Sequence, residues 1–190
     1  FIRLSRGSGV EGLSSMQEMT ILSNGTRLIR PLLDFKKIDL TNIAKRKFGK
    51  IFKDPSNKNK RFLRTNIREL KKNLVKNGLK IEKIMRSIKN IASTKQAIDF
   101  YVSESIKRLV SFEREITFID FKKFKSQPSE IKFRIINSVV KKRSNSYYPP
   151  RSKKVFNLIE GFQTNRIKKC TLGGCIFERK KTYLHVSKEL

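Results

Sequence analysis

Apolar residues recur about every 3.5 positions through the middle of the chain, and this pattern restricts the possible folds more than any other feature. It extends over residues 81–109 and predicts two helices that share one buried face. A similar pattern over residues 62–76 ends at Asn77 and Gly78, where glycine favours helix termination. We therefore predict a helix pair packed on a core. A coiled-coil interface is the alternative, and a potential break near Ser93 disfavours it.

Residues 1–60 alternate between strand and helix patterns. Two short apolar runs flank Asn24 and Gly25, a pair typical of β-hairpin turns. A helical pattern follows from Asp39, its expected cap, to Gly49, its expected stop. Such alternation is typical of an α/β sheet.

Residues 97–190 predict a second compact unit of the α+β type. A β-rich run at 116–119 comes first. Two amphipathic helical patterns follow, and Ser126 with Pro128 opens the first of them. Alternating residues over 172–186 predict a basic hairpin. Together the patterns predict a mainly α chain with minor β structure.

Charge restricts the class of partner. The chain of 190 residues carries 45 Lys and Arg against 16 Asp and Glu, a formal net charge of +29. Such an excess favours nucleic acid as the partner. The alternatives are an anionic membrane surface, or a lysine-rich composition in a structural protein with no polyanionic partner. No apolar run approaches the ~20 residues that cross a bilayer, so we expect a soluble, cytoplasmic protein. Because nucleic acid is favoured as the partner, we expect no membrane partner.

The sequence offers little for catalysis. It contains two cysteines and one histidine, too few for a disulfide framework or a zinc site. We expect Cys170 and Cys175 to be buried small residues, His185 to be structural, and no metal to be bound. No Gly-x4-Gly-Lys-Ser/Thr loop, acid pair or catalytic triad can be assembled. The residues alone therefore indicate a binding protein.

One arginine-rich segment suggests phosphate binding. Arg61, Arg64 and Arg68 have spacings that put them on one helical face, and guanidinium groups bind phosphate oxygens in pairs. Asp54 or Asn57 is expected to cap this helix and hold the arginines in place. A solvated basic face is the alternative.

A second basic segment combines aromatic rings with charge. Tyr148 and Arg151 precede Lys153 and Lys154, as in sites for single-stranded nucleic acid. The alternative is a proline-capped helix start with tyrosine in the core. Near the N-terminus, Arg6 precedes a glycine-rich turn that suits either a phosphate or a helix end.

Five strings occur along the chain in a fixed order. They are Arg6-Gly7-Ser8-Gly9-Val10-Glu11-Gly12-Leu13, Arg30-Pro31-Leu32-Leu33, Asp54-Pro55-Ser56-Asn57 with Arg64 and Arg68 downstream, Tyr148-Pro149-Pro150-Arg151 and Thr171-Leu172-Gly173-Gly174-Cys175. With these motifs the chain resembles the bacterial tRNA(Ile)-lysidine synthetases, and the last two are similar to those of the alphaproteobacterial branch. The resemblance extends over nearly the whole chain.

The resemblance implies an N-type ATP pyrophosphatase, whose doubly wound α/β domain binds ATP through a Ser-Gly-Gly-x-Asp-Ser loop. These ligases adenylate the wobble cytidine of tRNA(Ile) with a CAU anticodon, and free lysine then displaces AMP to form lysidine. Neither that loop nor the family's His-x-x-Asp-Asp-Gln stretch occurs in this sequence. We therefore expect the C-terminal portion of such an enzyme, inactive alone, with the catalytic residues and most of the site for ATP and Mg²⁺ elsewhere. Family members are often dimers.

The resemblance also implies roles for single residues. Expected to face the phosphates of ATP or of tRNA are Arg6, Asp54, Asn57, Arg64 and Arg68. Expected to contact tRNA are Tyr148, Arg151, Lys153, Lys154, Lys168 and Lys169. Thr65 stands where the family usually has Asn, so no role of that Asn is transferred.

The predicted organisation has three parts. Residues 1–60 form the C-terminal part of the nucleotide-binding domain, 61–96 a helical connector and 97–190 the tRNA-recognition domain. The alternative function is a stand-alone basic RNA-binding protein without catalytic activity.

Overall fold

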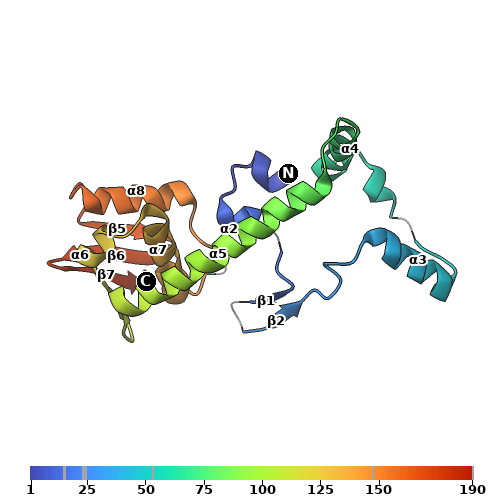
Figure 1. The fold of residues 1–190 in the computed structure, drawn as a ribbon. Coiled ribbons are helices and arrows are strands. Elements are labelled where there is room, and N and C mark those ends of the chain that lie inside the picture. Colours follow the sequence, from blue (N-terminus) through green and yellow to red (C-terminus); the bar gives the residue numbers. More distant parts are fainter. Residues whose placement is uncertain (15, 23–24, 53, 147, 190) are drawn as a thin grey trace. The chain divides into compact units, whose positions relative to one another are not determined.

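The computed structural model describes residues 1–14, 16–22, 25–52, 54–146 and 148–189. The chain divides into two compact units, unit 1 (Phe1–Lys95) and unit 2 (Gln96–Leu190). The division falls within the long helix α5 (Ile81–Leu109), drawn in green in Figure 1. The predicted division into residues 1–60, 61–96 and 97–190 stays a prediction.

Unit 1 consists of short elements and few strands. Its elements are α1 (Ile2–Ser5), α2 (Val10–Leu13), β1 (Met19–Ile21), β2 (Arg27–Ile29), α3 (Lys37–Phe48), the 3-10 turn η1 (Pro55–Lys58), α4 (Leu63–Lys76) and the first part of α5. Strands β1 and β2 pair antiparallel, with Met19 opposite Ile29. In the described part of unit 1 no other strands pair, so the doubly wound parallel sheet stays a prediction.

The ends of α3 show which local signals decide a helix. Gly49 has a φ of 69°, a left-handed conformation that glycine adopts without strain, and it ends α3 as predicted. The start differs from the prediction, because Lys36 occupies the N-cap and Asp39 lies within the first turn. There the Asp39 carboxylate faces the positive end of the helix dipole.

Helix α5 is continuous from Ile81 to Leu109, so the predicted break near Ser93 is wrong, and one helix replaces the helix pair predicted over these residues. The hydroxyl of Thr94 donates a hydrogen bond of 3.0 Å to the carbonyl oxygen of Asn90, one turn earlier. Because the helix itself satisfies this polar side chain, Ser93 and Thr94 continue the helix. Helix α4 ends at Lys76, as predicted.

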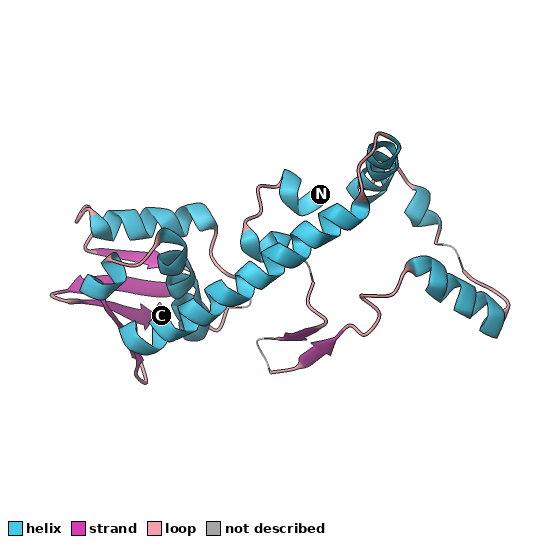
Figure 2. Cartoon of the chain, in the orientation of Figure 1, coloured by secondary structure: helices cyan, strands magenta, loops and turns pink. Residues whose placement is uncertain are grey.

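Unit 2 is a five-stranded antiparallel sheet covered by helices. After the second part of α5 come β3 (Val110–Phe112), β4 (Ile116–Asp120), α6 (Phe121–Lys125), α7 (Ser129–Ser144), α8 (Ser152–Gln163), β5 (Lys169–Leu172), β6 (Cys175–Lys180) and β7 (Tyr183–Lys188). The strand order is β3-β4-β7-β6-β5. Figure 2 shows the strands in magenta beside these helices. The predicted strand at 116–119 and the predicted hairpin are present as β4 and the β6–β7 pair.

The core of unit 2 lies between one face of the sheet and the helices. Ile119 on β4, Phe177 on β6 and Leu184 on β7 are each 0% exposed, and so are Ile135 on α7 and Val155 on α8. This arrangement confirms the amphipathic helices predicted from their apolar spacing. Cys170 and Cys175 are half-buried and buried thiols, and burial raises the pKa of both.

Helix α6 was not predicted, and its start has a clear cause. The Oδ1 atom of Asp120 accepts a hydrogen bond of 3.1 Å from the backbone N–H of Lys123 and caps α6. Ser126 is the C-cap of α6, and Pro128 alone takes the N-cap of α7. The prediction that Ser126 opens α7 is therefore wrong.

Candidate functional site

A tight turn in unit 1 carries the first polar group of the candidate site. Asp54 caps η1, because its Oδ1 atom accepts a hydrogen bond of 2.8 Å from the backbone N–H of Ser56. Hydrogen bonds from the Ser56 side chain and then from its backbone N–H hold the pKa of the Asp54 carboxyl below its ordinary value. The Asp54 carboxylate is therefore charged near neutral pH and fixes the shape of η1.

Asn57 connects this turn to α4. Its Oδ1 atom accepts a hydrogen bond of 3.0 Å from Nη1 of Arg68, and its Nδ2 atom donates one of 3.3 Å to the carbonyl oxygen of Asp54. The N-cap of α4 is Phe62, which makes no capping side-chain bond. The prediction that Asp54 or Asn57 caps this helix is thus wrong. Asn57 instead orients the guanidinium group of Arg68.

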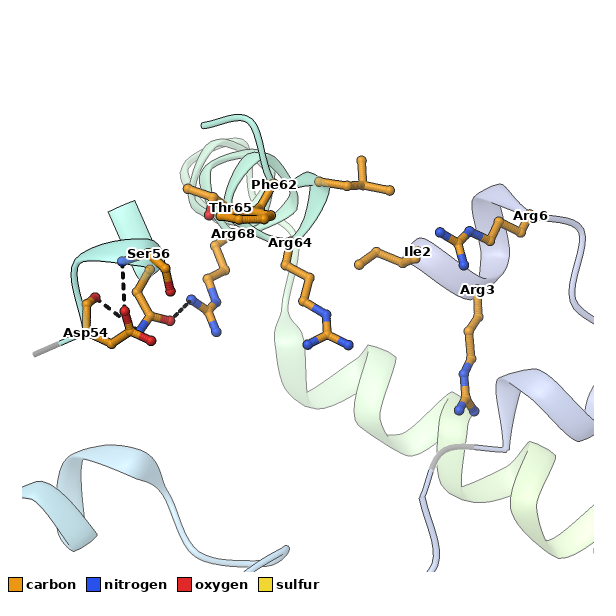
Figure 3. Close-up of a pocket in the computed structure, with 11 residues that line it drawn as sticks. Ile2, Arg3, Arg6, Asp54, Ser56, Phe62, Arg64, Thr65 and Arg68 are labelled. Atoms are coloured by element: carbon orange, nitrogen blue, oxygen red, sulfur yellow. Dashed lines mark hydrogen bonds between the residues drawn. The ribbon is translucent and has the colours of Figure 1, made fainter. Parts of the chain in front are cut away.

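A surface cavity of about 760 Å³ lies among α1, η1 and α4. Its lining residues are Ile2, Arg3, Arg6, Asp54, Ser56, Asn57, Phe62, Leu63, Arg64, Thr65 and Arg68. Figure 3 shows Arg64 and Arg68 projecting side by side from α4, while Arg3 and Arg6 come from α1. Three segments that are separate in the sequence therefore contribute to one concave surface.

The lining is strongly cationic. It includes four arginines, whereas Asp54 is the one carboxylate among the lining residues. In the described part of the chain, neither the Arg6 nor the Arg64 side chain makes a hydrogen bond or ion pair, so both guanidinium groups retain their donors for a ligand. Guanidinium groups grouped in this way suit phosphate or carboxylate oxygens, which accept two parallel N–H bonds.

The predicted phosphate-facing residues come together here. Arg6, Asp54, Asn57, Arg64 and Arg68 all line the cavity, although their roles stay predictions. Arg61 does not line it, because α4 begins at Leu63 and Arg61 precedes the helix. Its backbone N–H donates a hydrogen bond of 2.9 Å to Oδ1 of Asn59 instead. Of the three arginines predicted to share one helical face, only Arg64 and Arg68 lie on α4 and line the cavity.

Sequence reasoning missed Arg3. Its Nη1 atom donates a hydrogen bond of 2.7 Å to the carbonyl oxygen of Gly12, which ties α1 to α2 at the cavity wall. Arg3 and Arg6 are three residues apart, a spacing that puts two side chains on the same side of a helical turn. That spacing is the signal that could have identified Arg3.

The predicted tRNA-contacting residues of unit 2 form two groups. Tyr148 is exposed, Arg151 is the N-cap of α8, and Lys153 and Lys154 lie exposed in its first turn. Lys168 precedes β5 and Lys169 is its first residue. Both lie close to the other end of α8, since the backbone N–H of Ile167 donates to the carbonyl of Gly161. The structure does not bring these six side chains into one site.

A glycine turn holds the first group in place. Gly173 follows β5 with a φ of 60°, and a Cβ atom added there would lie 2.8 Å from Val140 and 2.9 Å from Pro150. The turn therefore packs directly against the segment that leads into α8. Substitution of Gly173 would force either Val140 or the segment with Pro150 to move.

Two general features complete the site description. Among the residues that the structure describes, no group of three or more His, Cys, Asp and Glu side chains could hold a metal ion. Within the same residues, no helix combines the length and the apolar composition that crossing a bilayer requires.

Comparison with known proteins identifies the class of unit 1. Residues 1–74 match the model of the PP-loop domain. This range contains α1, η1 and most of α4, the three elements that line the arginine cavity. The cavity thus lies within the part of the chain that matches the PP-loop domain.

Several proteins of one family are similar to this chain in sequence. The tRNA(Ile)-lysidine synthase of Wolbachia pipientis wMel is 31% identical over 179 residues, which cover 92% of this chain and 41% of the relative. That of Orientia tsutsugamushi (strain Boryong) is 29% identical and covers 100% of this chain and 44% of the relative. The tRNA(Ile)-lysidine synthase of Ruegeria pomeroyi is 26% identical, and the match covers 92% of this chain and 41% of the relative. The chain is therefore similar to these proteins over nearly all of its own length, as its motifs predicted, and it spans about two-fifths of their length.

Proposed function

We propose that the chain is part of an ATP-dependent tRNA(Ile)-lysidine synthetase, the ligase that joins lysine to the wobble cytidine of tRNA(Ile) with a CAU anticodon. One observation carries this proposal: the arginine cavity lies within the PP-loop match of a chain whose relatives are named tRNA(Ile)-lysidine synthase. The chain contributes phosphate binding through unit 1 and tRNA binding through unit 2. The catalytic residues would belong to other parts of the protein, which acts in the cytoplasm.

The cavity fits phosphate groups. ATP, when bound, supplies the adenylyl group that activates the cytidine. Arg64 and Arg68 would neutralise phosphate charge, and Asn57 holds the guanidinium group of Arg68 in position before any ligand arrives. A donor that is already oriented stabilises developing negative charge without paying for its own reorganisation. Arg6, on the α1 side of the cavity, would bind either ATP phosphate or the tRNA backbone.

The cavity fits Mg²⁺ less well. Asp54 is the single carboxylate among the lining residues, and its Oδ1 atom already accepts the backbone N–H of Ser56. Mg²⁺ prefers several oxygen ligands in octahedral geometry. We therefore assign Mg²⁺ binding to residues outside this cavity.

Unit 2 would anchor the tRNA. Exposed basic residues at both ends of α8 provide two contact points for the phosphate backbone, the first including Arg151, Lys153 and Lys154 and the second Lys168 and Lys169. Backbone contacts fix the register of an RNA without reading its sequence. Anchoring of this kind helps a modification enzyme to hold an anticodon base out of its stack.

The test is chemical and uses the gene with its upstream reading frame. We expect that frame to encode a Ser-Gly-Gly-x-Asp-Ser loop and a His-x-x-Asp-Asp-Gln stretch. The expressed protein, given ATP, lysine and a tRNA(Ile) transcript, should produce lysidine, detected by mass spectrometry of the digested nucleosides. A double variant Arg64→Ala/Arg68→Ala should lose most of this activity. A frame without those motifs, or a protein that forms no lysidine, would remove the proposal.

A further inference from the structure

One face of the unit 2 sheet is not covered by its helices. Side chains alternate along each strand, so Thr117, Ile119, Leu184 and Val186 point into the core. Their neighbours point to the opposite face, and none of the described strand residues on that face is buried. These residues are Ser111, Ile116, Phe118, Asp120, Lys169, Thr171, Ile176, Glu178, Lys180, Tyr183, His185 and Ser187. We call this surface the open sheet face.

Ring-bearing side chains occupy the middle of the open sheet face. Phe118 on β4 lies directly opposite His185 on β7, and their ring centroids are 4.8 Å apart with the planes at 75°. Phe118 also meets Tyr183 edge to face, at 6.4 Å. Both strands are central in the sheet. Tyr183 is 46% exposed, so this ring cluster reaches solvent.

Charged groups border the cluster on the side of β6 and β5. In the strand register, His185 lies opposite Glu178 on β6, and Glu178 lies opposite Lys169 on β5. The Glu178 carboxylate is neutralised by Lys180, whose Nζ atom lies 3.0 Å away, and the Asp120 carboxylate by Lys123 at 3.2 Å. The two acidic groups of the face therefore already have partners, while Lys169 is exposed at the edge strand.

We propose that the open sheet face binds unpaired nucleotides of an RNA, with bases stacked on Tyr183, Phe118 and His185 and phosphates held by Lys169. An antiparallel sheet with helices behind it and aromatic rings on central strands is an effective platform for single-stranded RNA. The proposal rests on the proposed function, in which the RNA is a tRNA. It adds a base-stacking site, separate from the backbone contacts at the ends of α8.

Charge favours RNA over a second copy of the chain on this face. Unit 2 carries 21 Lys and Arg against 9 Asp and Glu, a net charge of 21 − 9 = +12. Two copies meeting face to face would bring two such units together and would repel each other. A polyanion with exposed bases satisfies both the rings and the surrounding lysines.

The test separates stacking from charge. In the chain of 190 residues, Phe118→Leu/Tyr183→Leu removes two aromatic planes but keeps apolar bulk, and Phe100→Leu on α5 is the matched control, since Phe100 is 71% exposed. Binding of a mixed-sequence single-stranded decaribonucleotide, a blunt RNA duplex and a tRNA(Ile) transcript is measured by fluorescence anisotropy at several salt concentrations. The double variant should bind the single strand roughly 10-fold more weakly or worse. Its slope of log K against log salt should stay unchanged.

A charge variant gives the complementary result. Lys169→Gln should reduce the salt slope by about 0.7 unit for the single strand. Circular dichroism confirms that each variant is folded, and Tyr183→Leu alone serves if the double variant is not. The control Phe100→Leu should bind as the unaltered chain does.

Each other outcome overturns a defined statement. If the unaltered chain binds tRNA but the ring variants bind all three RNAs as tightly, the open sheet face is not a stacking site and the proposed function stands. If the unaltered chain binds no tRNA even at low salt, its proposed role in tRNA binding is wrong, and the stacking site that rests on this role is wrong with it. If the ring variants change only the mass measured by light scattering, the face is a protein interface and the proposal is wrong.

Discussion

Unit 1 and unit 2 differ in where their apolar side chains lie. Among the described residues, all 20 buried hydrophobic side chains belong to unit 2, whereas the buried residues of unit 1 are Ser14 and Thr65. Large apolar side chains of unit 1 are exposed, with Phe48 at 75% and Phe52 at 96%. Unit 2 is therefore stabilised by burial of a core, and unit 1 mainly by local hydrogen bonds.

This difference matches the division of tasks that we propose. The arginine cavity is shaped by hydrogen bonds on the surface of unit 1, such as Asp54 with Ser56 and Asn57 with Arg68. The open sheet face instead stands on a packed core that fixes the positions of its strands. Four experiments test how far this contrast holds.

The largest effect is expected from a cavity in the core of unit 2. Phe177 is 0% exposed, so Phe177→Ala should reduce the free energy of unfolding by about 3–5 kcal/mol. Phe52→Ala in unit 1 is the matched control and should change it by less than about 0.5 kcal/mol. Urea unfolding followed by circular dichroism measures both. Equal effects would mean that unit 1 has a core of its own.

Hydrogen exchange compares the two units directly. Backbone amides in α7, whose buried residues include Ile135 and Val139, should exchange at least about 100-fold more slowly than amides in α3, which has no buried residue. Mass spectrometry of peptides after timed labelling gives both rates in one sample. Similar protection in α3 and α7 would contradict the contrast.

Substitution of the paired arginines tests the cavity of unit 1. Arg64→Ala/Arg68→Ala should weaken tRNA binding and lower the slope of log K against log salt by about 1–2 units, because fewer counterions are released. Arg61→Ala is the control, since Arg61 precedes α4 and does not line the cavity. A filter-binding assay across salt concentrations measures the slopes. An unchanged slope would remove the pair from the tRNA site.

The smallest effect concerns the turn at Asp54. The pKa of this carboxyl lies below its ordinary value of 3.8, so the charged form stabilises the turn. That contribution is present above the ordinary pKa and is lost as the pH falls through the lowered one. Ser56→Ala removes the side-chain bond, which is the largest cause, and should raise the pKa part of the way back. A titration followed by NMR of the Asp54 side chain measures the shift, and an unchanged pKa would speak against this bond.

The sequence predicted elements with strong periodicity and missed those fixed by single contacts. Helix α4 and the strands of the β6–β7 hairpin follow from apolar spacing that repeats over many residues. Helix α6 depends on one cap by Asp120, and β3 follows α5 without any turn residue between Leu109 and Val110. Such short elements leave too little pattern to be recognised.

The candidate site shows the same limit. Motifs identified the five predicted cavity residues, all of which line one surface. Whether Arg61 or Arg3 joins them depends on where α4 begins and how α1 is placed, and helix boundaries are the least certain part of such predictions. His185, expected to be only structural, lies in the ring cluster of the open sheet face because β7 pairs with β4. Pairing of strands distant in sequence cannot be read from local pattern.

The contact at Gly173 has a consequence for how this chain can change over generations. Because a side chain there would collide with Pro150, the glycine turn and the Tyr148-Pro149-Pro150-Arg151 segment share one small volume. A side chain at position 173 would require Pro150 or Val140 to give way, whereas a change at most other positions of the two strings would not. Gly173 should therefore be inherited wherever Pro150 is, although more than twenty residues separate the first positions of the two strings.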